Sequence, residues 1–139
     1  MIIADTGYWL ALANRRDRFH QQAIAVTRTL NETLVTTWPV LTETCHLLST
    51  RLHPSAQNKL LAQAQKGLFQ LYELHIGHLP RIHILMEQYA DLPMDLADAS
   101  LMIVAEEIGR GDILSTDRRD FNTYRWKNHY PFNNLLLPN

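Results

Sequence analysis

Apolar residues in this chain gather in short runs and, between those runs, recur at the spacing of a helix. Short apolar or β-branched runs predict buried strands at residues 1–4, 34–37, 68–74 and 112–116, with a further short strand at 135–137. Apolar residues three or four positions apart predict amphipathic helices at residues 19–30, 39–52, 56–66, 79–89 and 96–108. Residues 8–13 are apolar almost throughout and predict a short helix. Strands and helices therefore alternate along the chain.

Turn and capping residues agree with these boundaries. Pro39 fits the first turn of its helix, where the missing N–H costs nothing, and Pro54 ends that helix. Asp95 stands near the start of the helix at 96–108, and Gly109 stands just past its end. The local signals and the periodicity thus predict the same elements.

The alternation of short strands with helices predicts an α/β protein, with a central, mainly parallel sheet between helical layers. No linker or repeat divides the sequence, so residues 1–139 are expected to form a single domain. Right-handed crossovers bring the carboxyl ends of parallel strands to one edge of the sheet, where open α/β sheets bind their ligands. Functional residues are therefore expected at that edge.

The composition excludes several classes of protein. The chain has 139 residues, of which 46% are hydrophobic, and no biased tract, which is typical of a globular protein. Cys45 is the single cysteine, so an internal disulfide is excluded and a reducing compartment is favoured. No apolar run approaches the ~20 residues of a membrane-spanning helix. Asp5 lies in the first apolar stretch with no basic residue before it, which argues against a signal peptide and favours a cytoplasmic protein.

Acidic residues follow the predicted strands, although the net charge is only −1. Asp5 and Asp117 each come directly after a strand, and Glu43 lies in the first turns of the helix after the second strand. Asp95 and Asp98 lie at the start of another helix, three positions apart and so on one face. The positive end of a helix favours acids nearby, which is enough to explain the acids at the two helix starts. It does not explain Asp5, which follows four apolar residues. Four segments thus deliver carboxylates to one sheet edge.

Such a group of carboxylates favours a hard divalent cation. Carboxylates within ~4–6 Å of one another repel and raise each other's pKa unless a cation lies between them. Mg²⁺ and Mn²⁺ prefer oxygen ligands, so aspartates rather than histidines favour these ions over zinc. A bound Mg²⁺ neutralises a phosphodiester and activates a water molecule as nucleophile. The acids therefore point to phosphate chemistry.

Four short motifs carry a resemblance to a known family: Ile2-Ile3-Ala4-Asp5-Thr6, Leu41-Thr42-Glu43, Asp95-Leu96-Ala97-Asp98-Ala99-Ser100-Leu101 and Ile113-Leu114-Ser115-Thr116-Asp117-Arg118-Arg119-Asp120-Phe121. In this order they resemble PIN-domain ribonucleases, and most closely the small VapC-type toxins of prokaryotic toxin–antitoxin pairs. The resemblance implies a three-layer α/β/α sandwich with three or four acids around one or two Mg²⁺ or Mn²⁺ ions that cleave RNA. It also implies a cognate antitoxin protein.

The resemblance assigns roles to individual residues. It implies catalytic roles for Asp5, Glu43, Asp98 and Asp117, with Asp5, Asp98 and Asp117 as the metal ligands. Asp98 is preferred to Asp95 because Ala99 and Leu101 follow it as the motif expects. Five further residues are expected to support the site: Thr6, Asp95, Ser115, Thr116 and Asp120.

Basic residues near the same edge are candidates for RNA binding. Without the four catalytic acids, 13 basic residues face 10 acidic ones, a mild attraction for a polyanion. The candidates are Arg15, Arg16, Arg118, Arg119, Arg125 and Lys127, and Arg18 lies close in sequence. Tyr124, Trp126 and His129 are interleaved with them, as suits single-stranded RNA. The alternative, solvated surface charges with Trp126 packed against the core, stays open.

Zinc chemistry has little support in the sequence. Cys45 and His46 are neighbours, but adjacent residues of a helix point ~100° apart and do not form a ligand pair. His75, His78 and His83 are the densest group of histidines and lack the spacing of a closed zinc site. Cys45 is more simply a small buried apolar residue.

Two other functions remain as alternatives. A haloacid-dehalogenase-type phosphohydrolase would use Asp5 as nucleophile. Such proteins carry the motif Asp-x-Asp at this point, whereas position 7 of this chain is glycine. A non-catalytic interaction module would use its acids only to cap helices, which Asp5 argues against. Motifs of serine hydrolases and P-loop proteins are missing from the sequence.

A homodimer is also expected. The sequence holds more apolar positions than one small sheet needs, at Leu10, Leu12, Leu41, Leu48 and residues 52–61. The family resemblance points the same way.

Overall fold

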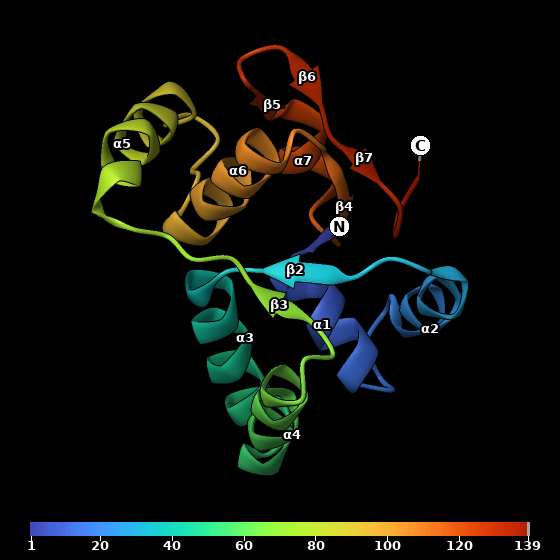
Figure 1. Ribbon diagram of the computed structural model, residues 1–139. Coiled ribbons are helices and arrows are strands. Elements are labelled where there is room, and N and C mark those ends of the chain that lie inside the picture. The colour runs from blue at the N-terminus through green and yellow to red at the C-terminus, as the bar shows by residue number, and fades with distance from the viewer. Residues whose placement is uncertain (139) are drawn as a thin grey trace.

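The computed structural model describes residues 1–138 and has a parallel sheet at its centre (Figure 1). Within these residues the sheet has five strands in the order β3-β2-β1-β4-β7, and every neighbouring pair is parallel. The strands are β1 (Ile2–Ala4), β2 (Leu34–Thr36), β3 (Gln70–Leu71), β4 (Asp112–Leu114) and β7 (Asn133–Asn134). The predicted α/β class is therefore confirmed.

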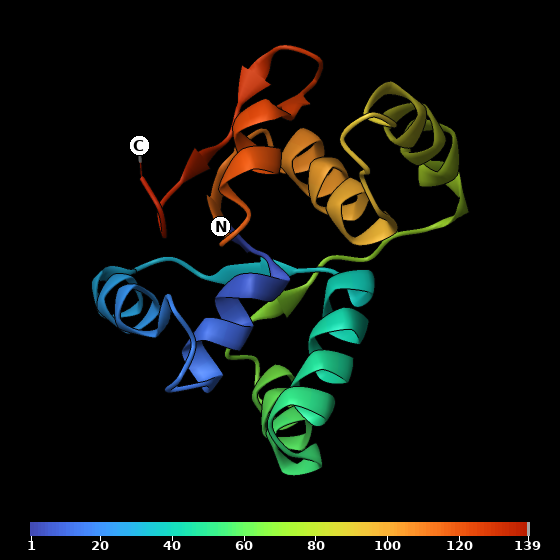
Figure 2. The same cartoon turned by 180° about the vertical axis from the view of Figure 1, so that it is seen from behind.

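Helices cover both faces of this sheet. They are α1 (Thr6–Ala13), α2 (His20–Thr29), α3 (Trp38–Arg51), α4 (Pro54–Gln65), the 3₁₀ turn η1 (Ile76–His78), α5 (Leu79–Gln88), α6 (Leu96–Ile108) and α7 (Arg118–Thr123). Figures 1 and 2 show α1 to α4 on one side of the sheet and α5 to α7 on the other, which gives the expected three layers.

The strand order places a switch point between β1 and β4. From β1 the chain moves outward to β2 and then β3, and it returns across the sheet to place β4 on the other side of β1. In open α/β sheets ligands bind beside the carboxyl ends of strands at such a point. This is where Asp5 and Asp117 leave the sheet.

Burial explains why the elements around this point are firmly held. All three residues of β1 are buried, and in α6 residues 99–105 are all buried between the sheet and its neighbours. Fully burying a leucine or isoleucine side chain stabilises the fold by ~1.5–3 kcal/mol. Tyr8 is also buried, and its hydroxyl hydrogen bonds to the Thr27 hydroxyl at 2.8 Å, which ties α1 to α2. The segments that carry the acids are thus part of the core.

The expected strand at 135–137 is wrong. The last strand is β7, which ends at Asn134, and the leucines after it turn inward, with Leu136 and Leu137 buried. The Asn134 side-chain oxygen accepts hydrogen bonds from the backbone N–H groups of Ser115, Leu136 and Leu137. This side chain bends the backbone out of the sheet, so the apolar run packs as a turn.

Three elements, one helix and two strands, have no clear signal in the sequence. Helix α7 has six residues, which is too short to show a helical period. Strands β5 (Arg125–Trp126) and β6 (Tyr130–Pro131) form a small antiparallel hairpin. Its turn has positive φ angles at Lys127 and Asn128, and the Lys127 N–H donates to Glu106 of α6 at 2.6 Å. Tertiary contacts rather than local pattern fix this hairpin.

A search of residues 1–138 for a helix long and apolar enough to cross a membrane finds none.

Candidate active site

Asp5 leaves β1 at the switch point and is 7% exposed. One of its carboxylate oxygens caps α1 by accepting from the Thr6 N–H at 2.8 Å. The other accepts from the Ser115 hydroxyl at 2.9 Å, and the Ser115 oxygen in turn accepts from the Asp117 N–H at 2.9 Å. The expectation that Asp5 has no helix to cap is therefore wrong, because α1 begins earlier than its apolar run indicated. Ser115 links the first and fourth acids.

Asp98 and Glu43 approach from the two helical layers. Asp95 caps α6 by accepting from the Asp98 N–H at 2.8 Å, which places Asp98 in the first turn. The Asp98 carboxylate accepts from the Tyr124 hydroxyl at 3.1 Å. Glu43 lies on α3, and α3 is joined to α6 by a 2.6 Å hydrogen bond between the Thr37 and Ser100 hydroxyls.

Asp117 and Asp120 occupy the start of α7. Asp117 caps this helix by accepting from the Asp120 N–H at 3.2 Å. Asp120 is buried and accepts from the Arg119 guanidinium at 3.2 Å. The two acids expected after β4 thus lie together, and one of them is already paired with an arginine.

These side chains line one cavity of about 310 Å³. Its acidic residues are Asp5, Glu43, Asp95, Asp98, Asp117 and Asp120, and Thr6 and Thr116 also line it. Every acid predicted from the sequence is therefore at this one site. The sequence interpretation missed five other lining residues, which are Gly7, Leu10, Leu47, Arg51 and Pro93.

Arg51 is the one basic residue among those that line this cavity in residues 1–138. It lies on α3 eight positions after Glu43, with Leu47 midway, so all three share a face of the helix. This spacing of four and eight positions is a signal that the sequence contains and that the sequence interpretation did not use.

The four predicted catalytic acids all have raised pKa values. Burial, with smaller contributions from the charges of Glu43 and Asp95, raises the pKa of Asp5 to about 6. Burial and the nearby charges of Asp5, Asp95 and Asp117 raise the pKa of Asp98 to about 8. Burial and Asp120 raise the pKa of Asp117 to about 7. Burial and the charge of Asp95 raise the pKa of Glu43. Positive charge in this cavity would therefore be strongly favoured.

The residues fit a divalent cation that keeps most of its water. Among residues 1–138 no three His, Cys, Asp or Glu side chains are placed to hold a metal ion directly. The Thr6 hydroxyl is buried and has no hydrogen-bond partner in the same part of the chain. The nearby Thr6 hydroxyl lowers the pKa of Glu43 slightly and so opposes the effect of burial. Its geometry does not meet the criteria of a hydrogen bond. Mg²⁺ binds through one or two carboxylates and several waters, for which an unpartnered hydroxyl is a ready acceptor or donor.

The predicted RNA-binding residues differ in how far they are engaged within the protein. The Arg125 guanidinium donates to the backbone carbonyls of Asn122, Thr123 and Tyr124. Lys127 lies over the ring of Trp126, which is itself buried. Arg119 pairs with Asp120, and Arg15, Arg16 and Arg118 are exposed and form no ion pair within residues 1–138. Trp126 thus follows the alternative interpretation of a ring packed against the core.

Two of the histidines, His75 and His78, contribute to the packing of the fold. The buried His78 hydrogen bonds to Glu107 of α6 at 2.9 Å, and its ring lies 4.0 Å from that of His75. These contacts fasten η1 to α6.

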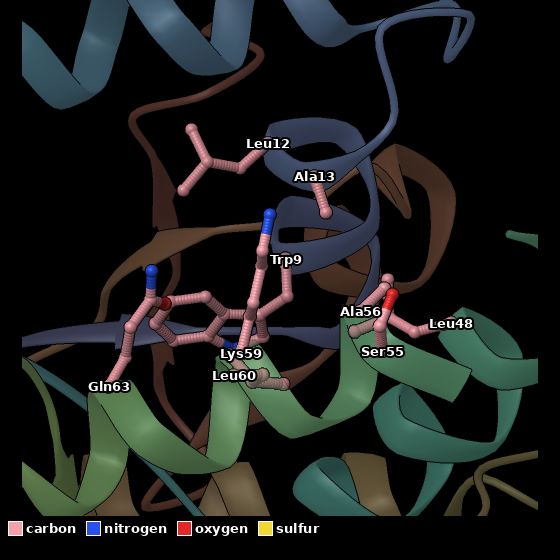
Figure 3. Close-up of a pocket in the computed structure, with 9 residues that line it drawn as sticks. All are labelled: Trp9, Leu12, Ala13, Leu48, Ser55, Ala56, Lys59, Leu60 and Gln63. Atoms are coloured by element: carbon pink, nitrogen blue, oxygen red, sulfur yellow. The ribbon is translucent and has the colours of Figure 1, made fainter. Parts of the chain in front are cut away.

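A second hollow, of about 290 Å³, lies away from the acids. Figure 3 shows it between α1, α3 and α4, with Trp9, Leu12 and Leu60 among its mainly apolar lining residues. Its lining residues include no acid.

Known proteins share this architecture. Ribonuclease VapC26 of Mycobacterium tuberculosis is 24% identical over 124 residues, which cover 89% of this chain and 92% of that protein. The crystal structure of Mycobacterium tuberculosis VapC20, described as a Sarcin-Ricin loop cleaving toxin, superposes with a TM-score of 0.80 at 20% identity. That match covers 86% of this chain and 92% of VapC20.

A family model described as the PIN domain matches residues 2–127. The matched range includes all the acids of the cavity and both strands of the switch point. The resemblance noted in the sequence is thereby confirmed, and the chain belongs to the PIN domain family.

Proposed function

We propose that this protein is a metal-dependent endoribonuclease that hydrolyses RNA phosphodiester bonds. The observation that carries the proposal is the buried acidic cavity at the β1/β4 switch point, where all four predicted catalytic acids have raised pKa values. Membership of the PIN family and the likeness to two named VapC proteins support it.

Asp5, Asp98 and Asp117 would hold Mg²⁺ or Mn²⁺, in part through water. When bound, such an ion neutralises the phosphodiester and lowers the pKa of a water molecule. The protein's own hydrogen bonds fix two of these carboxylates: Ser115 donates to Asp5, and Tyr124 donates to Asp98. These hydrogen bonds orient the two carboxylates in the metal-free protein.

Glu43 and Arg51 would act on the reacting groups. Hydrolysis forms one bond from a water oxygen to phosphorus and breaks one P–O ester bond, so a proton must leave the water. Glu43, half buried with a raised pKa, is suited to accept that proton. Arg51 lines the same cavity and can donate hydrogen bonds to the phosphate oxygens.

We further propose that the protein is the toxin of a toxin–antitoxin pair. The two named relatives support this role, and it would require a cognate antitoxin protein. A homodimer belongs to the same proposal, and sedimentation that shows a monomer at micromolar concentration would remove it.

The test is cleavage of a structured RNA with and without millimolar Mg²⁺ or Mn²⁺. We expect Asp5→Asn to lose on the order of 10³-fold or more in rate, because its carboxylate acts on the reaction itself. Asparagine still caps a helix, so the fold should be kept. Asp91→Asn, at an exposed turn after α5, is the matched control and should cleave at the wild-type rate.

Metal binding has a readout apart from activity. The unfolded chain lacks the cavity, so either ion should raise the melting temperature of the wild type and raise it less in Asp5→Asn. An Asp5→Asn variant that cleaves normally, or a wild type unaffected by both ions in melting and cleavage, would contradict the proposal.

A further inference from the structure

A basic hollow lies directly beside the acidic cavity. It has a volume of about 400 Å³ and is lined by Arg18, Phe19, Gln22, Thr116, Arg118 and Leu137. Thr116 lines the acidic cavity as well, and Arg118 follows Asp117 in the chain. One threonine therefore forms the wall between a strongly acidic hollow and a basic one.

Close packing fixes that wall. A Cβ atom added to Gly7 would lie 1.8 Å from the Thr116 hydroxyl oxygen, so glycine at position 7 leaves the space that the Thr116 side chain occupies against the first turn of α1. Gly7 itself lines the acidic cavity. The Thr116 side chain thus packs directly against the backbone of Gly7, between the two hollows.

The two arginines of this hollow are free to bind an anion. Within residues 1–138, neither Arg18 nor Arg118 forms an ion pair, and both are exposed. The Arg18 guanidinium lies 5.0 Å from the centre of the Phe19 ring, a contact that orients it without neutralising it. By contrast, Arg119 is paired with Asp120, and Arg125 is bound to backbone carbonyls.

We propose that this hollow binds a phosphate of the RNA strand next to the one that is cleaved. The inference rests on the proposed function, because it takes the acidic cavity as the place of the scissile phosphate. Two guanidinium groups can bind phosphate oxygens in pairs of hydrogen bonds, and Gln22 and Thr116 add neutral donors at the same hollow. The structure thereby separates Arg18 and Arg118, as substrate-binding residues, from Arg119 and Arg125.

An RNA strand fits this site better than an acidic peptide. The hollow shares its wall with a cavity lined by six carboxylates, which repels a chain of carboxylates. A phosphodiester chain can instead place one phosphate against a divalent ion in the acidic cavity and the next against the arginines. An acidic hollow directly beside a basic one therefore suits two neighbouring phosphates of one strand.

The first experiment measures binding of a short single-stranded RNA to protein that carries Asp98→Asn, so that cleavage does not interfere. For a single-stranded nucleic acid, the slope of log K against log salt falls by ~0.7 for each phosphate contact that is lost. We expect Arg18→Gln and Arg118→Gln each to lower the slope, by up to about that amount, and to weaken binding several-fold. Arg118→Lys keeps a charge and should restore most of the slope.

Arg28→Gln is the matched control, since Arg28 is an exposed arginine at the far end of α2. It should leave the slope unchanged. All these residues are exposed, so melting temperatures should agree with the parent protein, and this confirms that the variants are folded.

A second experiment locates the phosphate. In RNAs that carry a single neutral methylphosphonate linkage, one position beside the cleavage site should weaken binding to the parent protein. The same linkage should cost nothing further in the Arg18→Gln, Arg118→Gln double variant. Equal costs in both proteins, or salt slopes that match the Arg28→Gln control, would overturn the inference.

The outcomes also separate the two proposals. Wild-type protein that cleaves RNA while both arginine variants bind it normally overturns this inference and leaves the proposed function intact. Wild-type protein that never cleaves RNA removes the proposed function, whatever the salt slopes. If an acidic peptide, and not RNA, loses affinity in the arginine variants, the hollow binds a protein partner and the inference is wrong.

Discussion

Carboxylates gather at both ends of the sheet, but among residues 1–138 only the group at one end is paired throughout with basic groups. Before β1 and β4 begin, the Glu32 carboxylate accepts from the Arg110 guanidinium and from the amino group of Met1, and Arg110 also binds Asp112. Hydrogen bonds from Arg110 lower the pKa of Glu32 to about 2. At the opposite ends of the same strands, burial and mutual repulsion raise the pKa of Asp98 to about 8.

The difference separates structural acids from functional ones. An acid that lies beside its own arginine is satisfied by the fold and needs nothing from outside. A group of acids buried without such partners is stable only if protons, cations or a charged ligand complete it, and such groups are typical of functional sites. The contrast between Glu32 and Asp98 therefore supports the proposed site at the edge that carries Asp98.

The sharpest way to break this comparison is to neutralise one acid at each end. Asp98→Asn should lower RNA cleavage on the order of 10³-fold or more, and Glu32→Gln should leave it unchanged. In metal-free protein at neutral pH, Asp98→Asn should raise the melting temperature by about 3–6 °C, a shift that ~1 kcal/mol produces in a chain of this size. Glu32→Gln should lower it slightly, because exposed pairs contribute little.

Differential scanning calorimetry and a gel-based cleavage assay measure both effects on the same preparations. A lower stability of Asp98→Asn than of the wild type without metal would contradict a pKa of Asp98 that burial and the neighbouring charges raise. Equal stability changes in the two variants would erase the distinction between the two ends.

A second variant tests the link between the acids at the functional end. Ser115→Ala removes the hydroxyl that donates to Asp5 and accepts from the Asp117 N–H. Residues that orient a metal-binding side chain typically contribute 10–100-fold to metal affinity or activity, so we expect cleavage to fall by about that factor. Ser115→Thr restores the hydroxyl and should recover part of the rate.

The metal dependence distinguishes this positioning role from a general loss of structure. Ser115→Ala should need more Mg²⁺ or Mn²⁺ to reach half of its maximal rate, whereas a merely destabilised enzyme would keep the wild-type dependence. An unchanged metal titration would therefore count against the link that Ser115 makes.

The smallest expected effect is on the pH dependence of stability. Asp5, Asp98 and Asp117 have pKa values of about 6, 8 and 7 in the folded protein, against an ordinary value of 3.8. Between these limits the folded state binds more protons than the unfolded state, so stability falls as the pH rises from about 4 to 8. Metal-free protein should melt a few degrees lower at pH 8 than at pH 5.5.

Saturating Mg²⁺ or Mn²⁺ should flatten this slope, because the ion replaces the protons. Glu32 contributes in the opposite sense and only at acid pH, because its pKa is about 2 in the folded protein against an ordinary value of 4.5, and it is charged in both states well above that value. Melting curves across the pH range, with and without metal, measure the effect. Stability that rises between pH 5.5 and 8 without metal would contradict the raised pKa values.

The sequence predicted the acids that line the cavity better than it predicted the residues that hydrogen bond to them. Asp5 and Asp117 follow apolar runs, and Asp98 lies at a capped helix start, so local pattern places them at the carboxyl edge. Tyr124 comes 26 residues after Asp98, beyond a strand and a helix of six residues, and only the tertiary fold brings its hydroxyl to that carboxylate. No local pattern encodes such a contact.

The misplaced boundaries have a similar cause. The run at 135–137 is apolar in the manner of a strand, but a single side chain, Asn134, captures the following N–H groups and turns the chain inward. The start of α1 was missed because Thr6 and Gly7 are poor helix formers, and it is the Asp5 cap that makes a helix begin there. In both places one polar side chain outweighs the hydrophobic pattern.

Three of the acids, Asp5, Asp95 and Asp117, each begin a helix with one carboxylate oxygen. Substitution by alanine at any of them would therefore damage a helix start as well as the reaction, and the two losses would be confused. Natural variation should face the same constraint: a descendant that abandoned catalysis would still be under pressure to keep an Asp, Asn, Ser or Thr at these positions. An inactive relative would thus retain capping residues at these positions because its helices still require N-caps.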